Sequence, residues 1–176
     1  TRDRETIKIA DGVQTVGGLP TITQNGSKRK IDVLVENIGR VNYGKEICDE
    51  RKGLEDAILS SKAKLFGYET RTLPLNDLSK LEWSKEKNKG VRPCFFKGHF
   101  EAKSGIDTYV DFSKFGHGYI WINGFNLGRY WEIGPQKSLY VPASILREGE
   151  NEIVVFESDG LKGEPIVEFK NYPTLE

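Results

Sequence analysis

The stretch Tyr119-Ile-Trp-Ile-Asn-Gly-Phe-Asn-Leu-Gly-Arg-Tyr-Trp131 decides the fold class of the chain. Its first half alternates, with isoleucines on one side and aromatic residues on the other, which is the period of a β-strand. Asn123-Gly124 follows, and both residues tolerate positive φ, so a two-residue type I′ turn costs little here. The alternation then resumes toward Gly128, where the chain can bend. This stretch therefore predicts a β-hairpin.

Three aromatic residues and one arginine gather at the ends of the predicted hairpin: Trp121, Arg129, Tyr130 and Trp131. Sugar-binding surfaces use such groups, because the C–H face of a pyranose stacks on an aromatic ring while neighbouring polar groups hold the hydroxyls. Large aromatic residues more often fill sheet cores or domain interfaces, where they bury much area. Both interpretations remain open for these four residues.

Composition limits the classes of partner. The 176 residues include 26 basic and 26 acidic side chains, so the formal net charge is zero and nothing points to nucleic acid or to an acidic membrane surface. No apolar run is long enough to span a bilayer. Cys48 and Cys94 make no disulfide framework, and two free thiols predict a reducing compartment and a cytoplasmic location.

Strand signals recur at intervals of about ten residues, and no long amphipathic helix interrupts them, which predicts an all-β protein. Residues 73–92 combine an extended Leu-Pro-Leu segment, a short helical turn and a charged run, which together indicate a linker. We therefore predict two antiparallel β-sandwich modules, in residues 1–72 and 93–176. Besides the hairpin, the expected strands are residues 6–9, 21–23, 31–35, 64–68, 93–100, 108–112, 137–141 and 152–157.

Motifs for catalysis or metal binding are missing from the sequence. His99 and His117 are its only histidines, and with the two cysteines they form no zinc-ligand spacing. No nucleophile elbow, phosphate loop or His-Glu-x-x-His motif occurs. Glycoside hydrolysis needs two carboxylates around a sugar, and the spacing of Asp111, Glu132 and Glu157 marks no such pair. The residues thus predict no catalytic site, no metal and no cofactor.

A second candidate segment follows the strand expected at residues 31–35, which we predict to be buried. Here Gly39 and Gly44 frame Arg40, Asn42 and Tyr43. Loops at strand ends often carry binding groups. The alternatives are structural, with Arg40 bridging a nearby carboxylate such as Asp49 or Glu50, and Tyr43 packing beneath the loop.

Two long blocks carry a resemblance to one family. Residues 35–44, followed by Asp49 and Lys52-Gly53-Leu54, resemble the first accessory β-domain of β-galactosidases of glycoside hydrolase family 35. Residues 118–131, 134–136 and 139–142 resemble that family's C-terminal jelly roll, which is galactose-binding-domain-like. The likeness is good over residues 31–53 and 95–157 and weaker elsewhere. It implies a partial first accessory domain in residues 1–72 and a jelly roll in residues 93–176.

The resemblance implies a parent enzyme that removes terminal β-linked galactose with retention, through two glutamates on a TIM barrel. No position of this chain matches those glutamates, so we expect the chain alone to be inactive. The implied partners are the parent's own N-terminal catalytic barrel and, through the parent enzyme, a galactoside substrate. A start at Thr1 without methionine suggests a processed chain or a piece of a longer one, and an incomplete first module with an open sheet edge near residues 6–9 would favour self-association.

The resemblance also implies residue roles. Tyr43 matches a tyrosine that borders the site for the sugar or aglycone beyond the scissile bond, while Arg40, Asn42 and Asp49 support its loop. Without the barrel, Tyr43 should be exposed. Two other functions stay open: a lectin-like module that binds carbohydrate through the aromatic residues and the arginine of the hairpin, and an interaction or dimerisation module.

Overall fold

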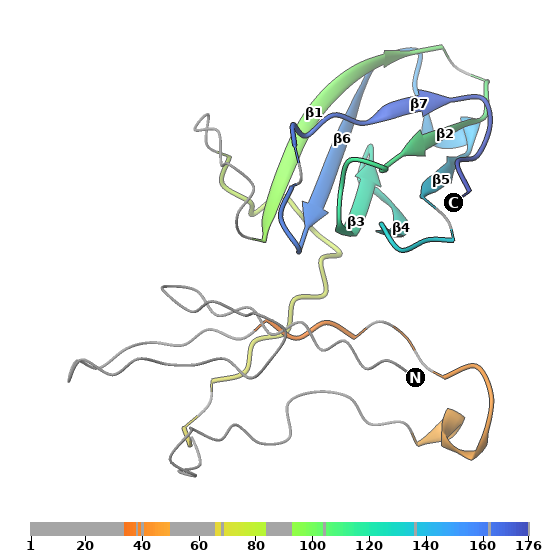
Figure 1. Cartoon of the computed structure of the whole chain (residues 1–176). Coiled ribbons are helices and arrows are strands. Elements are labelled where there is room, and N and C mark those ends of the chain that lie inside the picture. The colour runs from red at the N-terminus through yellow and green to blue at the C-terminus, as the bar shows by residue number, and fades with distance from the viewer. Residues whose placement is uncertain are drawn as a thin grey trace. The chain divides into compact units, whose positions relative to one another are not determined.

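A computed structural model of the chain describes residues 34–37, 39, 41–49, 66–67, 69–83, 93–103, 105–135, 137–161 and 163–175. The chain divides into two compact units, Thr1–Thr72 and Leu73–Glu176 (Figure 1). The expected linker, residues 73–92, therefore falls within the bounds of the second unit.

The second unit is an antiparallel β-sandwich with a four-stranded and a three-stranded sheet (Figure 1). The first sheet has the order β1 (Cys94–Ala102), β6 (Gly149–Glu157), β3 (His117–Ile122), β4 (Phe125–Trp131). The second has the order β5 (Ser138–Val141), β2 (Thr108–Asp111), β7 (Glu168–Lys170). A short 3₁₀-helix, η2 (Ala143–Ile145), follows β5. The described residues contain no α-helix, and the predicted all-β fold with antiparallel sheets is confirmed.

The predicted hairpin is β3 and β4. Ile122 pairs with Phe125, and the two residues between them have φ values of 51° for Asn123 and 82° for Gly124, as a type I′ turn requires. The register shifts after Ile120, which leaves Leu127 as an extra residue in β4. Gly128 absorbs this bulge with a φ of 115°. The turn and the bend are therefore both where the glycines of the sequence predict them.

Apolar side chains from the two sheets meet in one core. Tyr130, Ile120 and Ile122 come from the hairpin, and Val110 and Val141 come from the facing sheet. These residues are buried because they occupy the inward positions of their strands, where side chains alternate between the two faces of a sheet. The remaining buried members of the core are Phe112, Phe115, Ile153 and Val155.

Asp77 accepts a hydrogen bond from the Ser79 amide at 2.8 Å, and the Leu81 amide donates to the Leu78 carbonyl at 3.1 Å, which is the short helical turn that the sequence predicts. Two details differ from the sequence predictions. Strand β7 was not predicted, because its three residues carry too short a pattern and β7 forms by pairing with β2. Strand β6 begins at Gly149, before the predicted residue 152, because β1 pairs with it along its whole length.

The first unit is described in fewer places. Its one described element is the 3₁₀-helix η1 (Lys45–Cys48). The expected strands at residues 6–9 and 21–23 lie outside the described residues, as do most of residues 31–35 and 64–68. Val35 is exposed and is assigned to no strand, contrary to the buried strand that we predicted.

Candidate functional site

The loop of Tyr43 is the candidate site of the first unit. Gly39 and Gly44 have φ values of 111° and 102°, a region that favours glycine, and η1 begins directly after Gly44. The Asn37 side chain accepts a hydrogen bond from the Gly39 amide at 3.0 Å, which forms a local turn before the loop. Between the glycines, the Tyr43 side chain is 89% exposed, as expected for the chain alone.

Two of the three residues expected to support this loop are described by the structure. Arg40 lies outside the described residues, and so does Glu50, one of its expected carboxylate partners. Asn42 and Asp49 are described, and both are exposed. Their supporting roles therefore stay predictions.

The candidate sugar-binding residues of the hairpin separate into two pairs. Tyr130 is 1% exposed and Trp121 is 3% exposed, so neither ring offers a face to a ligand in this structure. Tyr130 points into the sandwich core and stacks on Phe112 with ring centroids 4.3 Å apart. Trp121 lies on the opposite face of its sheet, 6.3 Å from the ring of Phe95. Tyr130 and Trp121 are therefore packing residues, which is the alternative to sugar binding that the sequence left open.

Arg129 and Trp131 are half-buried and lie beside each other. The guanidinium carbon of Arg129 is 5.1 Å from the centroid of the Trp131 ring, which makes a cation–π contact. The His117 ring covers part of Trp131 at a centroid distance of 5.0 Å. A sugar site at this pair stays a prediction.

The Tyr130 hydroxyl belongs to a buried network around Glu157, which has no exposed surface. It lies 2.9 Å from the carbonyl oxygen of Phe156 and 3.0 Å from the Glu157 carboxylate. Burial, and then the nearby carboxylate charge, raises the pKa of Tyr130, so the hydroxyl stays protonated at neutral pH. The carboxylate also accepts hydrogen bonds from the amides of Gly116 at 2.9 Å and Asp159 at 2.7 Å.

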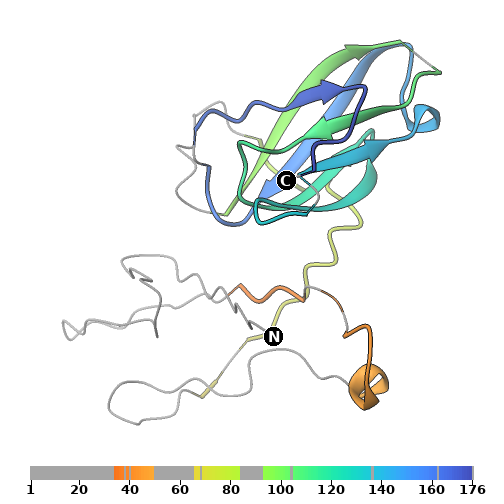
Figure 2. The ribbon, with the colours of Figure 1, turned by 45° about the vertical axis from the view of Figure 1, so that its right-hand side comes forward.

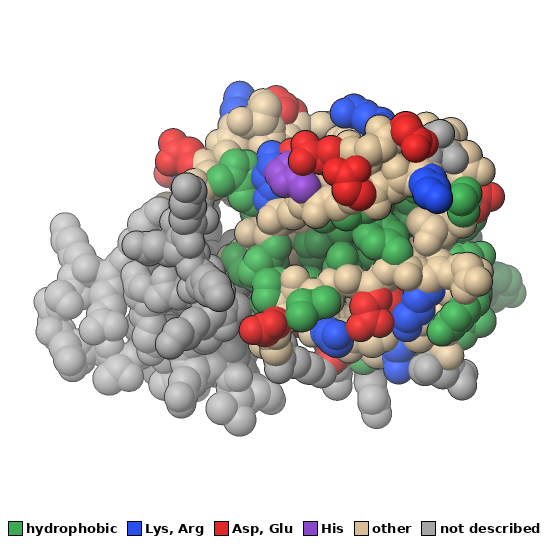
Figure 3. Space-filling view, turned by 90° about the horizontal axis from the view of Figure 1, so that it is seen from above, with side chains coloured by type: hydrophobic (Ala, Val, Ile, Leu, Met, Phe, Trp, Pro, Cys, Tyr) green, Lys and Arg blue, Asp and Glu red, His purple; other side chains and the backbone are tan. Residues whose placement is uncertain are grey.

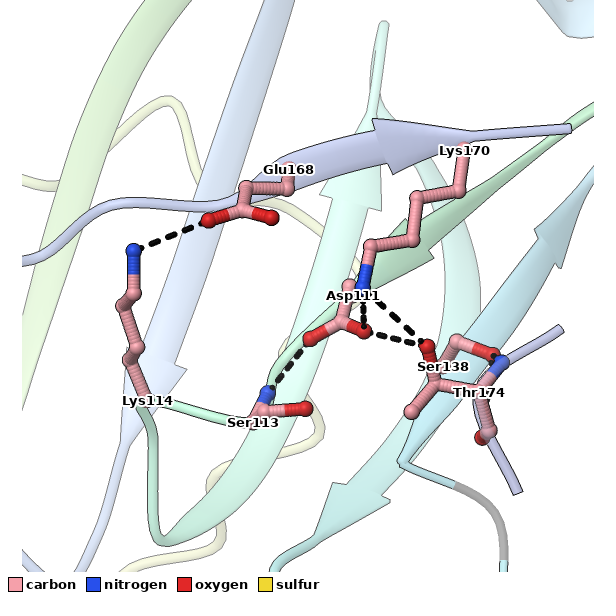
Figure 4. A network of polar contacts seen from close by, with 7 residues as sticks. All are labelled: Asp111, Ser113, Lys114, Ser138, Glu168, Lys170 and Thr174. Atoms are coloured by element: carbon pink, nitrogen blue, oxygen red, sulfur yellow. Dashed lines mark hydrogen bonds and ion pairs between the residues drawn. The ribbon is translucent and has the colours of Figure 1, made fainter. Parts of the chain in front are cut away.

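Asp111 is a second buried carboxylate, and it binds β7 and the C-terminal segment through hydrogen bonds (Figure 4). Its oxygens accept hydrogen bonds from the Lys170 ammonium at 2.7 Å, from the Ser113 amide at 2.8 Å and from the Thr174 hydroxyl. Burial alone would raise the pKa of Asp111, but these hydrogen bonds outweigh it and lower the pKa well below its ordinary value.

Asp111 and Glu157 are thus both occupied by structural hydrogen bonds. Sequence patterns could not predict either network, because Tyr130 and Gly116 lie 27 and 41 residues from Glu157, and Lys170 and Thr174 lie 59 and 63 residues from Asp111. Within the described residues, no group of three metal-ligating side chains is placed to hold an ion. Neither Cys48 nor Cys94 forms a disulfide.

A groove of about 390 Å³ lies between β1 and the segment that leads into β7. Figure 3 shows its apolar lining between two rims that carry charged side chains. Lys97 and His99 are the ionisable residues among its lining, so the groove offers little acid–base chemistry. In the described part of the chain, no helix is both long and apolar enough to cross a membrane.

Comparison with known proteins covers both units. Residues 5–75 match the family described as "Beta-galactosidase, first all-beta domain", and residues 93–151 match "Beta-galactosidase, galactose-binding domain". The candidate loop lies in the first match and the hairpin lies in the second. The predicted resemblance is therefore confirmed in both blocks.

Similar proteins carry β-galactosidase names. The chain is 42% identical over 118 residues to a beta-galactosidase of Xanthomonas manihotis, an alignment that covers 66% of the chain and 19% of that protein. It is 38% identical over 152 residues to beta-galactosidase-1-like protein 2 of Homo sapiens, covering 81% of the chain and 23% of the relative. It is 37% identical over 172 residues to beta-galactosidase of Mus musculus, covering 82% and 27%.

The chain thus spans about a fifth to a quarter of the length of these relatives. Two matches in one chain, each to a separate β-domain of the same enzyme family, agree with the fold and with the motifs of the sequence. The chain therefore belongs to the β-galactosidase family, of which it carries the first all-beta domain and the galactose-binding domain.

Proposed function

We propose that the chain is the non-catalytic accessory part of a longer β-galactosidase, and that it supports the catalytic barrel and shapes the rim of the substrate site. The observation that carries this proposal is the presence of two accessory-domain matches in one chain that spans only a fifth to a quarter of its relatives. The parent enzyme would hydrolyse terminal β-linked galactose. The galactose-binding label of one domain describes a family and does not by itself assign a ligand to this chain.

The two units differ in a way that supports the proposal. The second unit is a closed sandwich whose two buried carboxylates are both occupied by hydrogen bonds, so its described part suits a structural role. The first unit presents Tyr43 on a loop whose flanking glycines have positive φ. Tyr43 is 89% exposed and so lacks the packing that normally stabilises a tyrosine, which fits a side chain that the rest of the enzyme or the substrate would cover.

Tyr43 is the residue of this chain that we place at the rim. Its ring would stack on the sugar or aglycone beyond the scissile bond, and its hydroxyl would pair with a substituent of that group. Such an interaction binds the substrate and its transition state alike, so its loss raises KM more than it lowers kcat.

The test is Tyr43→Ala in the full-length enzyme, with substrates that extend beyond the scissile bond compared against a short chromogenic galactoside. We expect KM to rise for the extended substrates and the melting temperature to stay unchanged. Lys45→Ala, at the exposed first position of η1 directly after the loop, is the matched control. An unchanged KM together with a melting temperature lower by several degrees would show that Tyr43 is a packing residue.

A second test addresses the accessory role directly. The chain alone should leave a chromogenic β-galactoside intact, and addition of a separately produced catalytic part should increase the activity or stability of that part. Turnover by the repurified chain that disappears when one of its carboxylates is replaced would contradict the proposal.

A further inference from the structure

Strand β1 lies at one edge of the four-stranded sheet, and in the part of the chain that the structure describes it pairs with β6 alone. Its nine residues keep one continuous register with β6, so no bulge interrupts this edge. In an antiparallel strand, every second residue directs its amide and its carbonyl away from the partner strand. β1 therefore presents a row of backbone donors and acceptors along its outer side.

The other edge strands of the two described sheets are shorter or interrupted. β4 contains a bulge, β5 has four residues and is followed by Pro142, and β7 has three residues. Such features discourage pairing with a further strand. Lys97 of β1 does not guard its edge in the same way, because it forms an ion pair with Glu152 of β6 and its ammonium lies 5.3 Å from the centroid of the Trp83 ring. Of these edges, β1 is therefore the one best suited to accept another strand.

The apolar groove of about 390 Å³ runs along β1, between this strand and residues 165–167, which lead into β7 (Figure 3). Phe96 and Phe100 of β1 line it, and the Phe100 ring contacts that of Phe169 in β7 at a centroid distance of 4.4 Å. Gly98 lies between the two phenylalanines, and a Cβ added there would meet a core side chain of β6 at 3.4 Å. The groove thus has a recess over Gly98 in which the core of the sandwich is uncovered.

Two edges of different sheets border this groove, since β7 is the last strand of the three-stranded sheet. Both can be followed in Figure 2, with β1 in green and β7 in dark blue. An extended segment lying here would form backbone hydrogen bonds with β1 and would place every second side chain in the groove. A compact apolar molecule would leave the backbone groups of the edge unused. The surroundings therefore favour a strand as the occupant.

We propose that β1 accepts one additional β-strand, supplied by a segment of the parent enzyme that lies outside this chain. The inference rests on the accessory role proposed above, and it names the contact through which the second unit joins the rest of the enzyme. The aligned relatives extend far beyond the matched region, which covers 19% to 27% of their length, so chain is available to supply the segment. The segment should carry apolar residues at alternate positions, one of which fills the recess over Gly98.

The test is amide hydrogen exchange, read by mass spectrometry, in the isolated chain and in the full-length enzyme. We expect the β1 peptide to exchange slower by roughly tenfold or more in the full-length enzyme, because the donated strand protects its outer amides. Peptides from the central strand β3 should exchange alike in both and serve as the internal control. Equal exchange of β1 in both proteins would overturn the proposal. Protection of β1 that rises with the concentration of the isolated chain would also overturn it, since a second copy would then be the occupant.

Substitutions at the groove sharpen the test. Ile166 is 45% exposed at the groove, and Ile166→Asp should return β1 exchange in the full-length enzyme to the rate of the isolated chain. Ile133→Asp is the matched control, because Ile133 is 57% exposed and is not part of the groove lining. Gly98→Val fills the recess from below and gives an independent variant if Ile166→Asp fails to fold. An Ile133→Asp variant that releases β1 as strongly as Ile166→Asp does would contradict the proposal.

Photo-crosslinking identifies the donor. With p-benzoylphenylalanine in place of Ile166, the full-length enzyme should form a link from the groove to an extended segment outside residues 1–176. A link to another part of these 176 residues, or to a second copy, would overturn the proposal. Failure of the strand proposal is distinguishable from failure of the accessory role, because the latter is judged by whether the chain changes the activity or stability of a separately produced catalytic part.

Discussion

The Tyr130 hydroxyl reaches Oε2 of Glu157 at 3.0 Å by crossing over strand β3. Tyr130 and Glu157 belong to strands that lie on either side of β3, and both pair with the same residue, Gly118. A side chain at Gly118 would occupy the space through which the tyrosine passes, because an added Cβ would lie 2.7 Å from its hydroxyl oxygen. The glycine therefore permits the hydrogen bond that ties β4 to β6.

Replacement of Glu157 should weaken the second unit strongly. Glu157→Gln turns one acceptor oxygen into a donor facing backbone amides, and we expect a loss of about 2–3 kcal/mol in the free energy of unfolding, measured by urea denaturation. Tyr130→Phe removes one hydrogen bond and should cost about 1 kcal/mol. Equal effects of the two changes would show that the amides of Gly116 and Asp159 do not depend on the carboxylate.

Gly118 should tolerate no side chain. In Gly118→Ala the new methyl group would lie 1.7 Å from the carbonyl oxygen of Phe156, so β3 and β6 must separate, at a cost of about 3 kcal/mol or more. Gly163→Ala is the matched control, because a Cβ there meets nothing within 4 Å. Thermal unfolding compares the two, and a melting temperature that is equally unaffected in both would contradict the predicted clash.

The side chain of Asn123 should matter separately from its backbone conformation. Its amide donates to the carbonyl of Ile145 and to Asn151, both at 2.8 Å, and its oxygen accepts from the Glu152 amide at 3.0 Å. Asn123→Gly keeps the backbone freedom but loses these bonds, at an expected cost of about 1–3 kcal/mol in chemical denaturation. If this variant is as stable as the unmodified chain, the side-chain hydrogen bonds of Asn123 add nothing to stability, and only its tolerance of positive φ matters.

Gly124 should respond to substitution through its backbone alone. An added Cβ would meet nothing within 4 Å, but a φ of 82° is strained for a β-branched residue. Gly124→Val should therefore lower the free energy of unfolding by about 1–3 kcal/mol. Gly124→Asn, which tolerates positive φ, is the control and should recover most of this loss in the same thermal scan. A Val variant with an unchanged midpoint would mean that the turn adopts another type.

The Asp111 network should make stability depend on pH in acid. Because the folded pKa of Asp111 is depressed, its contribution is fully present above the unfolded pKa of about 3.9 and is lost as the pH falls toward the lower folded pKa. Asp111→Asn should lower the melting temperature at neutral pH by several degrees and flatten its decline below pH 4. The control is Glu168→Gln, which breaks the exposed ion pair with Lys114 and should change little. Parallel pH profiles for the Asp111 variant and the unmodified chain would count against the network.

The sequence by itself determined the local features of this protein. Alternating residues and Asn123-Gly124 predicted the hairpin, and the structure has the turn with positive φ at both positions. The same local signals predicted most strands of the second unit, because strand period and turn chemistry are properties of neighbouring residues. The exposure of Tyr43 was expected from the family resemblance and the absence of the barrel, and Tyr43 is exposed in the structure.

Tertiary structure alone decided which residues meet across the fold. Strand β7 exists because β2 offers it partners, and the burial of Tyr130 and Trp121 depends on which sheet face each ring occupies. The hydrogen bonds between Glu157 and Gly116 and between Asp111 and Thr174 join residues that lie 41 and 63 positions apart in the sequence. No local pattern encodes such contacts, since a buried carboxylate is stable only where distant parts of the chain bring donors to it.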